Sequence, residues 1–362
     1  MASTPPPLTP DFGRPPFAGA KEARFQPAPA DGVVPEGFFS TSNLPTYVRV
    51  GAQWQLPARP RMDGVIVRRN DALEIVEPRR VRRGEPVAMG LAEDGGDGIV
   101  VHGEGFLGGG ASPNEFRFMG TEVSRERPVN YDEMAERVEA ERRAGGYLIW
   151  VVGPALVHAR SRSEFEWFIR NGYVQAVLVG NAVAVHDIEA AIYGTSLGMT
   201  STGQTAAAGH GLHMRAINKV RAAGTIEAAE ASGMVRSGIM HALISRRVPY
   251  VLAGSIRDDG PLPGVITDSM AAQDAMREHT VRATGAILVA TALHAIAVGN
   301  LLPAFHTHRG APEPLMTICV DQTEFVVSKL KDRGTHQAYG VVTNAQDFMH
   351  VLRFYVEQCR ES

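Results

Sequence analysis

Short apolar segments bounded by turn residues recur along the chain, and their pattern changes near residue 130. Before that point, runs of β-branched and aliphatic residues are separated at close spacing by Gly, Pro, Asn and Asp, which is typical of short antiparallel strands. The expected strands are 47–50, 64–67, 73–76, 86–89, 98–101 and 116–119. We therefore predict a small β-rich domain over residues 33–128.

Beyond residue 129, near-continuous apolar runs alternate with amphipathic helical segments. Apolar runs of this kind are typical of strands that are covered on both faces. The expected strands are 147–152, 176–179, 250–253, 286–289, 317–320 and 340–342. The expected helices include 163–171, 213–223, 225–231, 270–279 and 347–358. This alternation predicts an α/β fold over residues 129–362, with a doubly wound parallel sheet.

The first 32 residues are rich in Pro, Ala and Gly and poor in large aliphatic side chains. Such a segment buries too little apolar surface to offset the entropy lost on ordering. We expect a mobile tail over residues 1–32.

Composition limits the class of protein. The chain has 362 residues, of which 44% are hydrophobic, and a net charge of −3. It can build a large core, and its charge gives no reason to expect nucleic acid or a membrane as a partner. No apolar run approaches the ~20 residues needed to span a bilayer. Cys319 and Cys359 have no metal-type spacing, which suits a reducing cytoplasm. We also expect a homo-oligomer.

Charged residues gather directly after the strand expected at 250–253. The carboxyl ends of parallel strands are where such sheets bind ligands. Arg257 can hold a carboxylate with two hydrogen bonds, and Asp258 or Asp259 can move a proton. We rank Asp258 first and Asp259 second. Because consecutive side chains seldom point the same way, we expect one of the two to be structural. The alternative is a surface turn in which an Asp caps the next helix.

A dinucleotide is the natural ligand of this architecture, although the chain has no GxGxxG motif. Small or polar residues at three strand ends would let a backbone approach a phosphate. These candidates are Gly153, Pro154, Gly180, Asn181 and Thr291. Asp321 follows the next strand and can accept both hydroxyls of a ribose, although an Asp in this place is more often a helix cap.

Histidines invite a metal hypothesis, which the spacing does not favour. Two pairs lie close together in the sequence, His210 with His213 and His306 with His308. Zinc needs three or four convergent ligands, so we predict no metal site. For His210 and His213 a substrate or capping role is favoured. His186, beside Asp187, is either a charge-stabilised imidazole in a cleft or half of a helix-surface pair.

Four runs carry a resemblance that covers about residues 36–358: STSNLPTYVR at 40–49, GNAVAVHDIEAAIYGTSLG at 180–198, AGSIRDDGPLPGVITD at 253–268 and LHAIAVGNLLP at 293–303. The first run resembles proteins labelled lysine-oxoglutarate reductase/saccharopine dehydrogenase bifunctional. The others resemble the archaeal ornithine cyclodeaminases and the C-terminal half of the cyanobacterial arginine dihydrolase/ornithine cyclodeaminases.

The resemblance implies a modified Rossmann-type domain that holds NAD tightly and recycles it. NAD+ would take hydride from Cα of L-ornithine, the δ-amine would attack the resulting iminium, and ammonia would leave. Returning the hydride would then give L-proline. On this basis Arg257 clamps the substrate carboxylate, and Asp258 or Asp259 handles the amine protons. Asn181 and Asn300 orient nicotinamide or substrate.

Two alternatives remain open. One is another NAD-dependent amino-acid or imine oxidoreductase, or an opine-type dehydrogenase, which would release NADH. The other is a non-catalytic NAD-binding regulatory module, against which the charge cluster at 257–259 argues. The loops expected at 200–209 and 305–313 are where the substrate would differ from that of the relatives.

Overall fold

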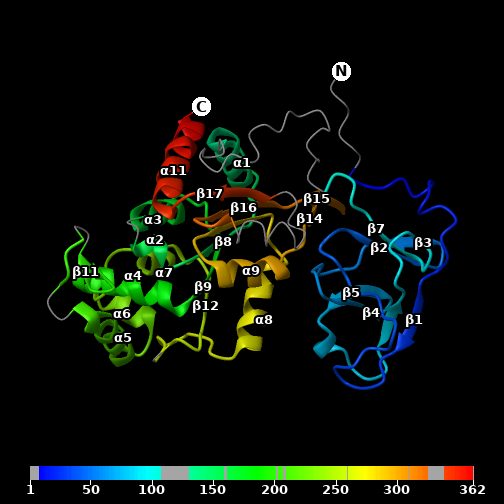
Figure 1. Ribbon diagram of the computed structural model, residues 1–362, viewed down its shortest axis with the longest axis horizontal. Coiled ribbons are helices and arrows are strands. Elements are labelled where there is room, and N and C mark those ends of the chain that lie inside the picture. Colours follow the sequence, from blue (N-terminus) through cyan, green and yellow to red (C-terminus); the bar gives the residue numbers. More distant parts are fainter. Residues whose placement is uncertain are drawn as a thin grey trace. The chain divides into compact units, whose positions relative to one another are not determined.

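The computed structural model describes most of the chain, and the described residues divide into two compact units (Figure 1). They are residues 8–106, 130–158, 161–200, 203–206, 209–258, 260–308, 310–324 and 338–361. The described parts of 8–106 and 299–315 form the first unit, and the others form the second. Residues 299–315 thus fall outside the domain predicted for them. The strand predicted at 116–119 lies outside the described residues.

The first unit is β-rich, as the punctuated pattern predicts. A four-stranded sheet has the order β1-β6-β4-β5, and a three-stranded sheet has the order β3-β2-β7. The strands are β1 (Arg24–Pro27), β2 (Thr46–Val50), β3 (Gln53–Gln55), β4 (Val65–Arg69), β5 (Ala72–Val76), β6 (Pro86–Met89) and β7 (Ile99–Val101), with a short 3-10 helix at Pro78–Arg80. Neighbouring strands in these sheets pair antiparallel.

The N-terminal segment is part of this unit, so the predicted mobile tail is wrong for its described residues. Strand β1 pairs with β6 from Arg24 opposite Met89 to Pro27 opposite Pro86. Phe17 is 4% exposed and packs edge-on against Trp54 at a ring-centroid distance of 5.0 Å. A few aromatic side chains therefore supply apolar burial that the average composition of the segment conceals.

The loop expected at 305–313 is instead a β-hairpin. Strands β14 (Phe305–His308) and β15 (Ala311–Pro314) pair antiparallel. Gly310, with φ +83°, occupies the turn between them. Phe305 is 1% exposed and packs against Phe106 in the same unit. The prolines in β15 hid the strand pattern.

The second unit contains a six-stranded, all-parallel sheet, which confirms the predicted fold class. Its order is β12-β9-β8-β13-β16-β17. The strands are β8 (Leu148–Val152), β9 (Ala176–Gly180), β12 (Tyr250–Ala253), β13 (Gly285–Val289), β16 (Met316–Asp321) and β17 (Ala338–Val342). Counted along the chain within this sheet, the order is 3-2-1-4-5-6, which is the order of dinucleotide-binding folds.

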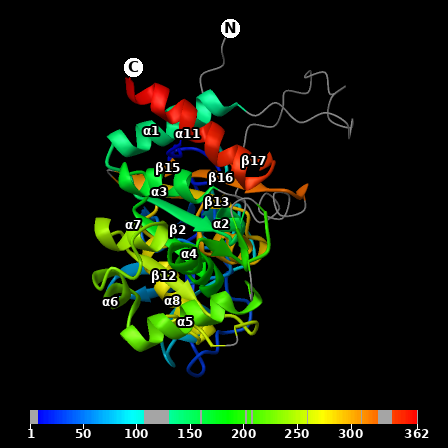
Figure 2. The same cartoon turned by 90° about the vertical axis from the view of Figure 1, so that its left-hand side faces the viewer.

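Helices cover both faces of this sheet (Figure 1). They are α1 (Tyr131–Arg143), α2 (Ala155–His158), α3 (Arg162–Arg170), α4 (Asn181–Tyr193), α5 (Leu212–Ala223), α6 (Ile226–Ala231), α7 (Ile239–Arg246), α8 (Ser269–Thr280), α9 (Ala292–Leu301) and α11 (Ala345–Glu361). Helices α1 and α11 lie side by side (Figure 2), with Tyr131 stacked on Tyr355 at a centroid distance of 6.2 Å. A short hairpin, β10 (Thr195–Ser196) and β11 (Met199–Thr200), follows α4. A 3-10 turn at Gly209–Gly211 precedes α5.

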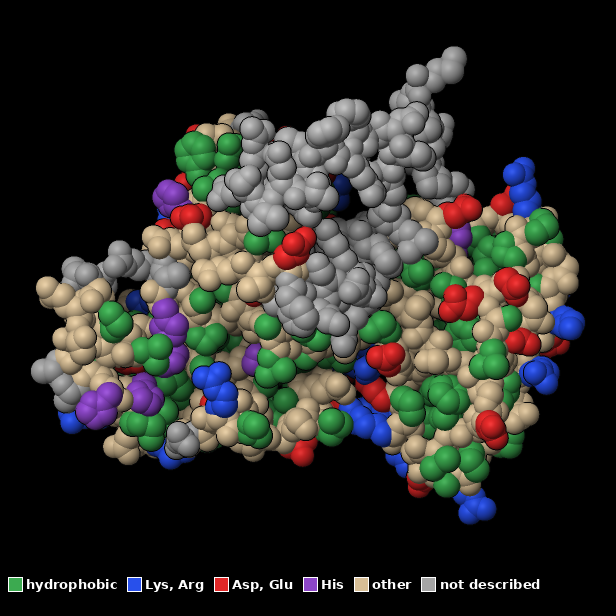
Figure 3. Space-filling model, viewed as in Figure 1, with side chains coloured by type: hydrophobic (Ala, Val, Ile, Leu, Met, Phe, Trp, Pro, Cys, Tyr) green, Lys and Arg blue, Asp and Glu red, His purple; other side chains and the backbone are tan. Residues whose placement is uncertain are grey.

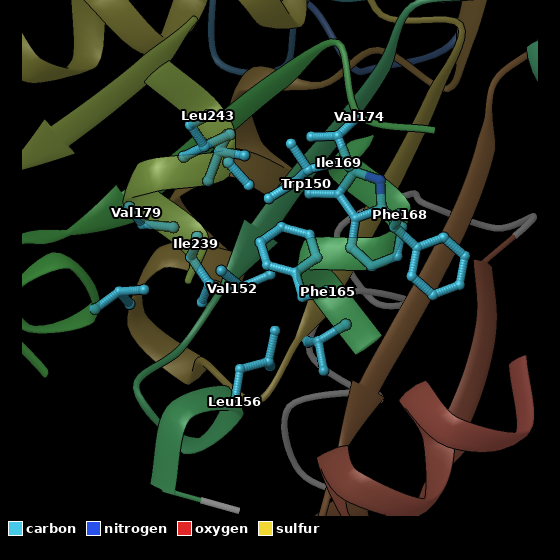
Figure 4. Packing of buried hydrophobic residues seen from close by; sticks show 14 of the residues in the cluster. Trp150, Val152, Leu156, Phe165, Phe168, Ile169, Val174, Val179, Ile239 and Leu243 are labelled. Atoms are coloured by element: carbon cyan, nitrogen blue, oxygen red, sulfur yellow. The ribbon is translucent and has the colours of Figure 1, made fainter. Parts of the chain in front are cut away.

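The core of the second unit explains why its strands read as unbroken apolar runs. Trp150, Phe165 and Phe168 are fully buried against one another between β8 and α3 (Figure 4). The Trp150 Nε1 donates to the Tyr173 carbonyl at 2.8 Å, so the ring is buried with its polar atom satisfied. Each large apolar side chain buried in this way contributes about 1.5–3 kcal/mol.

Candidate functional site

The six strands end at one edge of the sheet, and the winding direction reverses between β8 and β13. From β8 the chain builds outward through β9 and β12, and it then returns to the other side of β8 with β13. In open α/β sheets, the crevice outside the carboxyl ends at this reversal is where ligands bind. The turns there begin at Gly153 after β8 and at Ala290 after β13.

Gly153 is required by the close approach of these two turns. A Cβ at Gly153 would lie 1.8 Å from the Ala290 carbonyl oxygen and 3.1 Å from the Thr291 Cβ. The Gly153 N–H donates to the Val289 carbonyl at 2.9 Å, and the Pro154 carbonyl accepts from Val157 at 3.0 Å to begin α2. Packing alone therefore explains the glycine, and the phosphate-binding role of Gly153 and Pro154 stays a prediction.

The polar residues after β9 and β12 meet at the carboxyl edge, although they lie far apart in the chain. Asn181, which is 5% exposed, donates from Nδ2 to Asp258 Oδ1 at 3.1 Å. Its Oδ1 accepts from the Leu262 N–H at 3.1 Å, and Asp258 Oδ2 accepts from the Ser255 N–H at 2.8 Å. Asn181 thus ties the loop after β12 to the start of α4, as expected for residues that follow adjacent parallel strands.

His294 joins this cluster, and the sequence analysis missed it. It lies in the first turn of α9, and its ring packs over Gly180: a Cβ there would be 2.8 Å from His294 Cε1. Burial lowers the pKa of His294, and the Asp258 carboxylate opposes that shift. The position of His294, in the first turn after a buried strand, was the sequence signal that could have identified it.

The remaining predicted catalytic residues lie on the same loop. Arg257 is exposed, and its guanidinium makes no ion pair with another described residue. Ile256 is fully exposed, with a relative accessibility of 107%, and Leu293 at the start of α9 is 71% exposed. Asp259 lies outside the described residues. An exposed guanidinium can bind an amino-acid carboxylate.

Of the other predicted cofactor residues, the structure brings Thr291 and Asp321 to the carboxyl edge but not Asn300. Asp321 ends β16 and is partly exposed; its Oδ1 accepts from the Thr323 N–H at 3.0 Å and hydroxyl at 2.9 Å. Thr291 directly precedes α9. Asn300 lies in the last turn of α9, about 9 Å along the helix from His294 at 1.5 Å per residue.

His186 does not pair with its neighbour Asp187. The fully buried Asp187 binds Arg162 Nε at 2.6 Å and accepts from the N–H groups of Ile239 and Met240, which caps α7. The His186 Nδ1 faces Glu189 Oε2 at 3.3 Å instead. Burial raises the pKa of Glu189, but its hydrogen bonds outweigh burial and hold the pKa below its ordinary value.

Further histidines lie near His186 and Glu189. In Figure 3, histidine side chains gather over α4 and α5. The His158 Nδ1 lies 2.6 Å from Ser196 Oγ, and its ring is 4.7 Å from that of His186. The His213 ring is 6.4 Å from that of His186. Within the described part of the chain, no three His, Cys, Asp or Glu side chains are placed to hold a metal ion.

The other histidines of the two predicted pairs lie in the turn before α5 and on strand β14. His210 is in the turn before α5. His306 lies 3.9 Å from Glu313 across the β14–β15 hairpin, and His308 is exposed at the end of β14.

None of the helices in the described ranges is long and apolar enough to cross a membrane.

Two segments of the chain match known protein families. Residues 132–352 match the family described as arginine dihydrolase ArgZ-like, C-terminal, Rossmann fold, and residues 45–132 match the ArgZ-like C-terminal first region. The chain belongs to the ArgZ-like family. The resemblance carried by the sequence runs is thereby confirmed, and so is the Rossmann-type fold.

Relatives within the ArgZ-like family cover nearly the whole chain. An ornithine cyclodeaminase of Methanopyrus kandleri is 42% identical over 346 residues, which are 94% of this chain and 80% of the relative. A conserved LOR/SDH protein from Methanococcus maripaludis S2 superposes with a TM-score of 0.84 at 40% identity, covering 94% of this chain and 99% of the other. The ternary complex of AgrE with ornithine and NAD+ superposes with a TM-score of 0.59 at 32% identity, covering 95% of this chain and 47% of the other.

Proposed function

We propose that this chain is an NAD-dependent ornithine cyclodeaminase, which converts L-ornithine into L-proline and ammonia. The observation that carries the proposal is its 42% identity, over 94% of its length, to the ornithine cyclodeaminase of Methanopyrus kandleri. The AgrE complex, whose partners are ornithine and NAD+, supports the same pair of ligands. The proposal includes a cytoplasmic homo-oligomer as the working form.

The carboxyl edge of the sheet suits NAD. The strand order reverses between β8 and β13, where sheets of this kind bind ligands, and α9 begins there at Ala292, directly after Thr291, so its first N–H groups can meet a phosphate. Asp321 would accept the ribose hydroxyls from the neighbouring strand end, since its two internal hydrogen bonds both use Oδ1. When bound, NAD supplies hydride acceptance and return, which no side chain can supply.

The residues after β12 would hold the substrate. Arg257 presents an exposed guanidinium for the carboxylate of ornithine. Asp258, fixed by Asn181 and Ser255, would place a negative charge beside the ammonium groups. Asp259 stays the second candidate for proton transfer.

A product analysis tests the proposal. Purified protein with its NAD complement should convert L-ornithine into proline and ammonia in equal amounts, and no NADH absorbance should accumulate. NADH rising together with a keto acid would favour the alternative of an amino-acid oxidoreductase. Bound NAD without turnover of ornithine or a related diamine acid would favour a regulatory module.

A further inference from the structure

The proposed reaction needs a group that takes up a proton and later gives it back. The amine on the reacting carbon of ornithine must lose a proton before hydride can leave that carbon, and the amine that closes the ring must also be neutral. The departing ammonia must gain a proton. Ornithine with two ammonium groups and the products, zwitterionic proline and ammonium, hold the same number of protons. One residue that titrates near neutral pH can therefore serve the whole cycle.

Asp258 is held as a fixed charge. Both of its oxygens accept hydrogen bonds, one from Asn181 Nδ2 at 3.1 Å and one from the Ser255 N–H at 2.8 Å. Asn181 is itself fixed, because its Oδ1 accepts from the Leu262 N–H. Both carboxylate oxygens are thus already engaged as hydrogen-bond acceptors. This arrangement suits electrostatic support of a neighbour better than cycling of a proton.

His294 is the titratable neighbour. Its ring lies against the Gly180 backbone, where only the missing side chain of a glycine leaves room for it. The ring is partly buried, and Asp258 is the charged group among the described residues that acts on it. A buried imidazole beside a carboxylate can accept a proton and is stabilised once it carries one.

We propose that His294 is the residue that exchanges protons with the amines of the substrate, and that Asp258 and Asn181 are positioning residues that hold a negative charge beside its ring. This inference rests on the proposed function, and it assigns to His294 the task that the sequence analysis gave to Asp258.

The pH dependence of activity separates the two assignments. Burial lowers the pKa of His294, so the ring is neutral at pH 7 and ready to accept a proton. Activity should fall as the pH drops through that pKa, because the protonated ring cannot act as a base. Asp258 raises the pKa of His294, so Asp258→Asn should move this acid limb to lower pH while keeping it. If Asp258 were the base, the same substitution would abolish the limb.

The experiment compares His294→Gln and Asp258→Asn with wild-type protein, and uses His350→Gln as the matched control because its side chain is 76% exposed on another element. Bound NAD and the thermal unfolding midpoint are measured for each variant. We expect turnover of L-ornithine by His294→Gln to fall by ~100-fold or more with NAD retained. Free imidazole should restore part of the activity of His294→Ala, which a purely structural role would not permit.

Two outcomes would overturn the inference while leaving the proposed function intact. One is a His294→Gln variant with near-normal turnover and an unchanged acid limb. The other is an Asp258→Asn variant that has lost the limb entirely. Wild-type protein that does not convert ornithine would overturn both the inference and the proposed function.

Discussion

Gly180 and the imidazole of His294 share one small volume at the end of β9. A methyl group at position 180 would lie 2.8 Å from His294 Cε1 and 3.4 Å from Nε2, and the ring would have to move. Since the ring is the movable end of a side chain, Gly180→Ala should change the thermal unfolding midpoint little. Displacing a reacting group by about 1 Å can cost ~100-fold in rate, so we expect kcat to fall toward that limit.

The matched control is Gly211→Ala, where a new Cβ would meet no atom within 4 Å. Equal losses of kcat in the two variants would contradict the shared-volume argument. Weaker NAD binding with unchanged kcat would instead support the cofactor role predicted for Gly180 from the sequence.

Asp321 tests the cofactor assignment. If its carboxylate binds the ribose hydroxyls of NAD, Asp321→Ala should weaken NAD at least ~10-fold, because a hydrogen bond to a charged group contributes about 1.5–3 kcal/mol. The affinity can be measured by calorimetry on protein freed of nucleotide. Thr323→Ala is the control, since it removes one internal partner of Asp321 and leaves the carboxylate in place. An equal loss in both variants would mean that Asp321 acts only through its turn.

At the scale of elements, Glu139 stabilises the last turn of helix α1 and connects that turn to Tyr173 outside the helix. Its buried carboxylate accepts from Arg142 at 2.7 and 2.9 Å, from Arg143 at 2.7 Å and from the Tyr173 hydroxyl at 2.7 Å. The hydrogen bonds from Arg142 lower the pKa of Glu139 from 4.5 to about 2. The stabilisation is therefore complete above pH 4.5 and is lost as the pH falls toward 2.

Glu139→Gln should lower the free energy of unfolding at pH 7 by about 1–3 kcal/mol, because both arginine partners are partly solvated. It should also flatten the loss of stability between pH 4.5 and 2. Denaturant unfolding at several pH values measures both effects. Glu136→Gln, on the exposed face of the same helix, should change neither. A Glu139→Gln variant whose free energy of unfolding has the same pH dependence as that of the wild type would contradict this stabilising role of Glu139.

The sequence predicts elements well where their stability is local or where burial is continuous. The six strands of the parallel sheet were recognisable because both of their faces are covered. Helix α7 was missed because its N-terminus is capped by Asp187 from α4, a partner that no local pattern reveals. Strand β1 was missed for the same kind of reason, since it pairs with the distant β6.

The residues of the candidate site could be predicted where the topology of the sheet alone brings them together. Asn181 and Asp258 follow adjacent parallel strands, so their meeting at the carboxyl edge follows from topology. His186 and Asp187 are consecutive on a helix and point in different directions, whereas His186 and Glu189 are three residues apart and face each other. His294 escaped prediction because it lies within an otherwise apolar helix start.

At the scale of the whole molecule, the proposed reaction keeps the hydride within one site between the oxidation and the reduction. A pair of separate dehydrogenase reactions would instead release it as NADH. In the proposed reaction, the hydride removed from a carbon returns to the same carbon of the same substrate molecule. The site must also exclude water, which would hydrolyse the imine before the ring closes. Isotopic crossover tests the first of these two requirements.

A mixture of L-ornithine deuterated at Cα and L-ornithine labelled uniformly with carbon-13 should give no crossed product. Proline from the deuterated substrate should keep its deuterium, and carbon-13 proline should contain none, as mass spectrometry can show. Excess unlabelled NADH in solution, added as a control, should leave this pattern unchanged because the hydride does not pass through the free pool. Carbon-13 proline that carries deuterium would mean that hydride is exchanged between substrate molecules, and the proposed cycle would then be wrong even if proline and ammonia form in equal amounts.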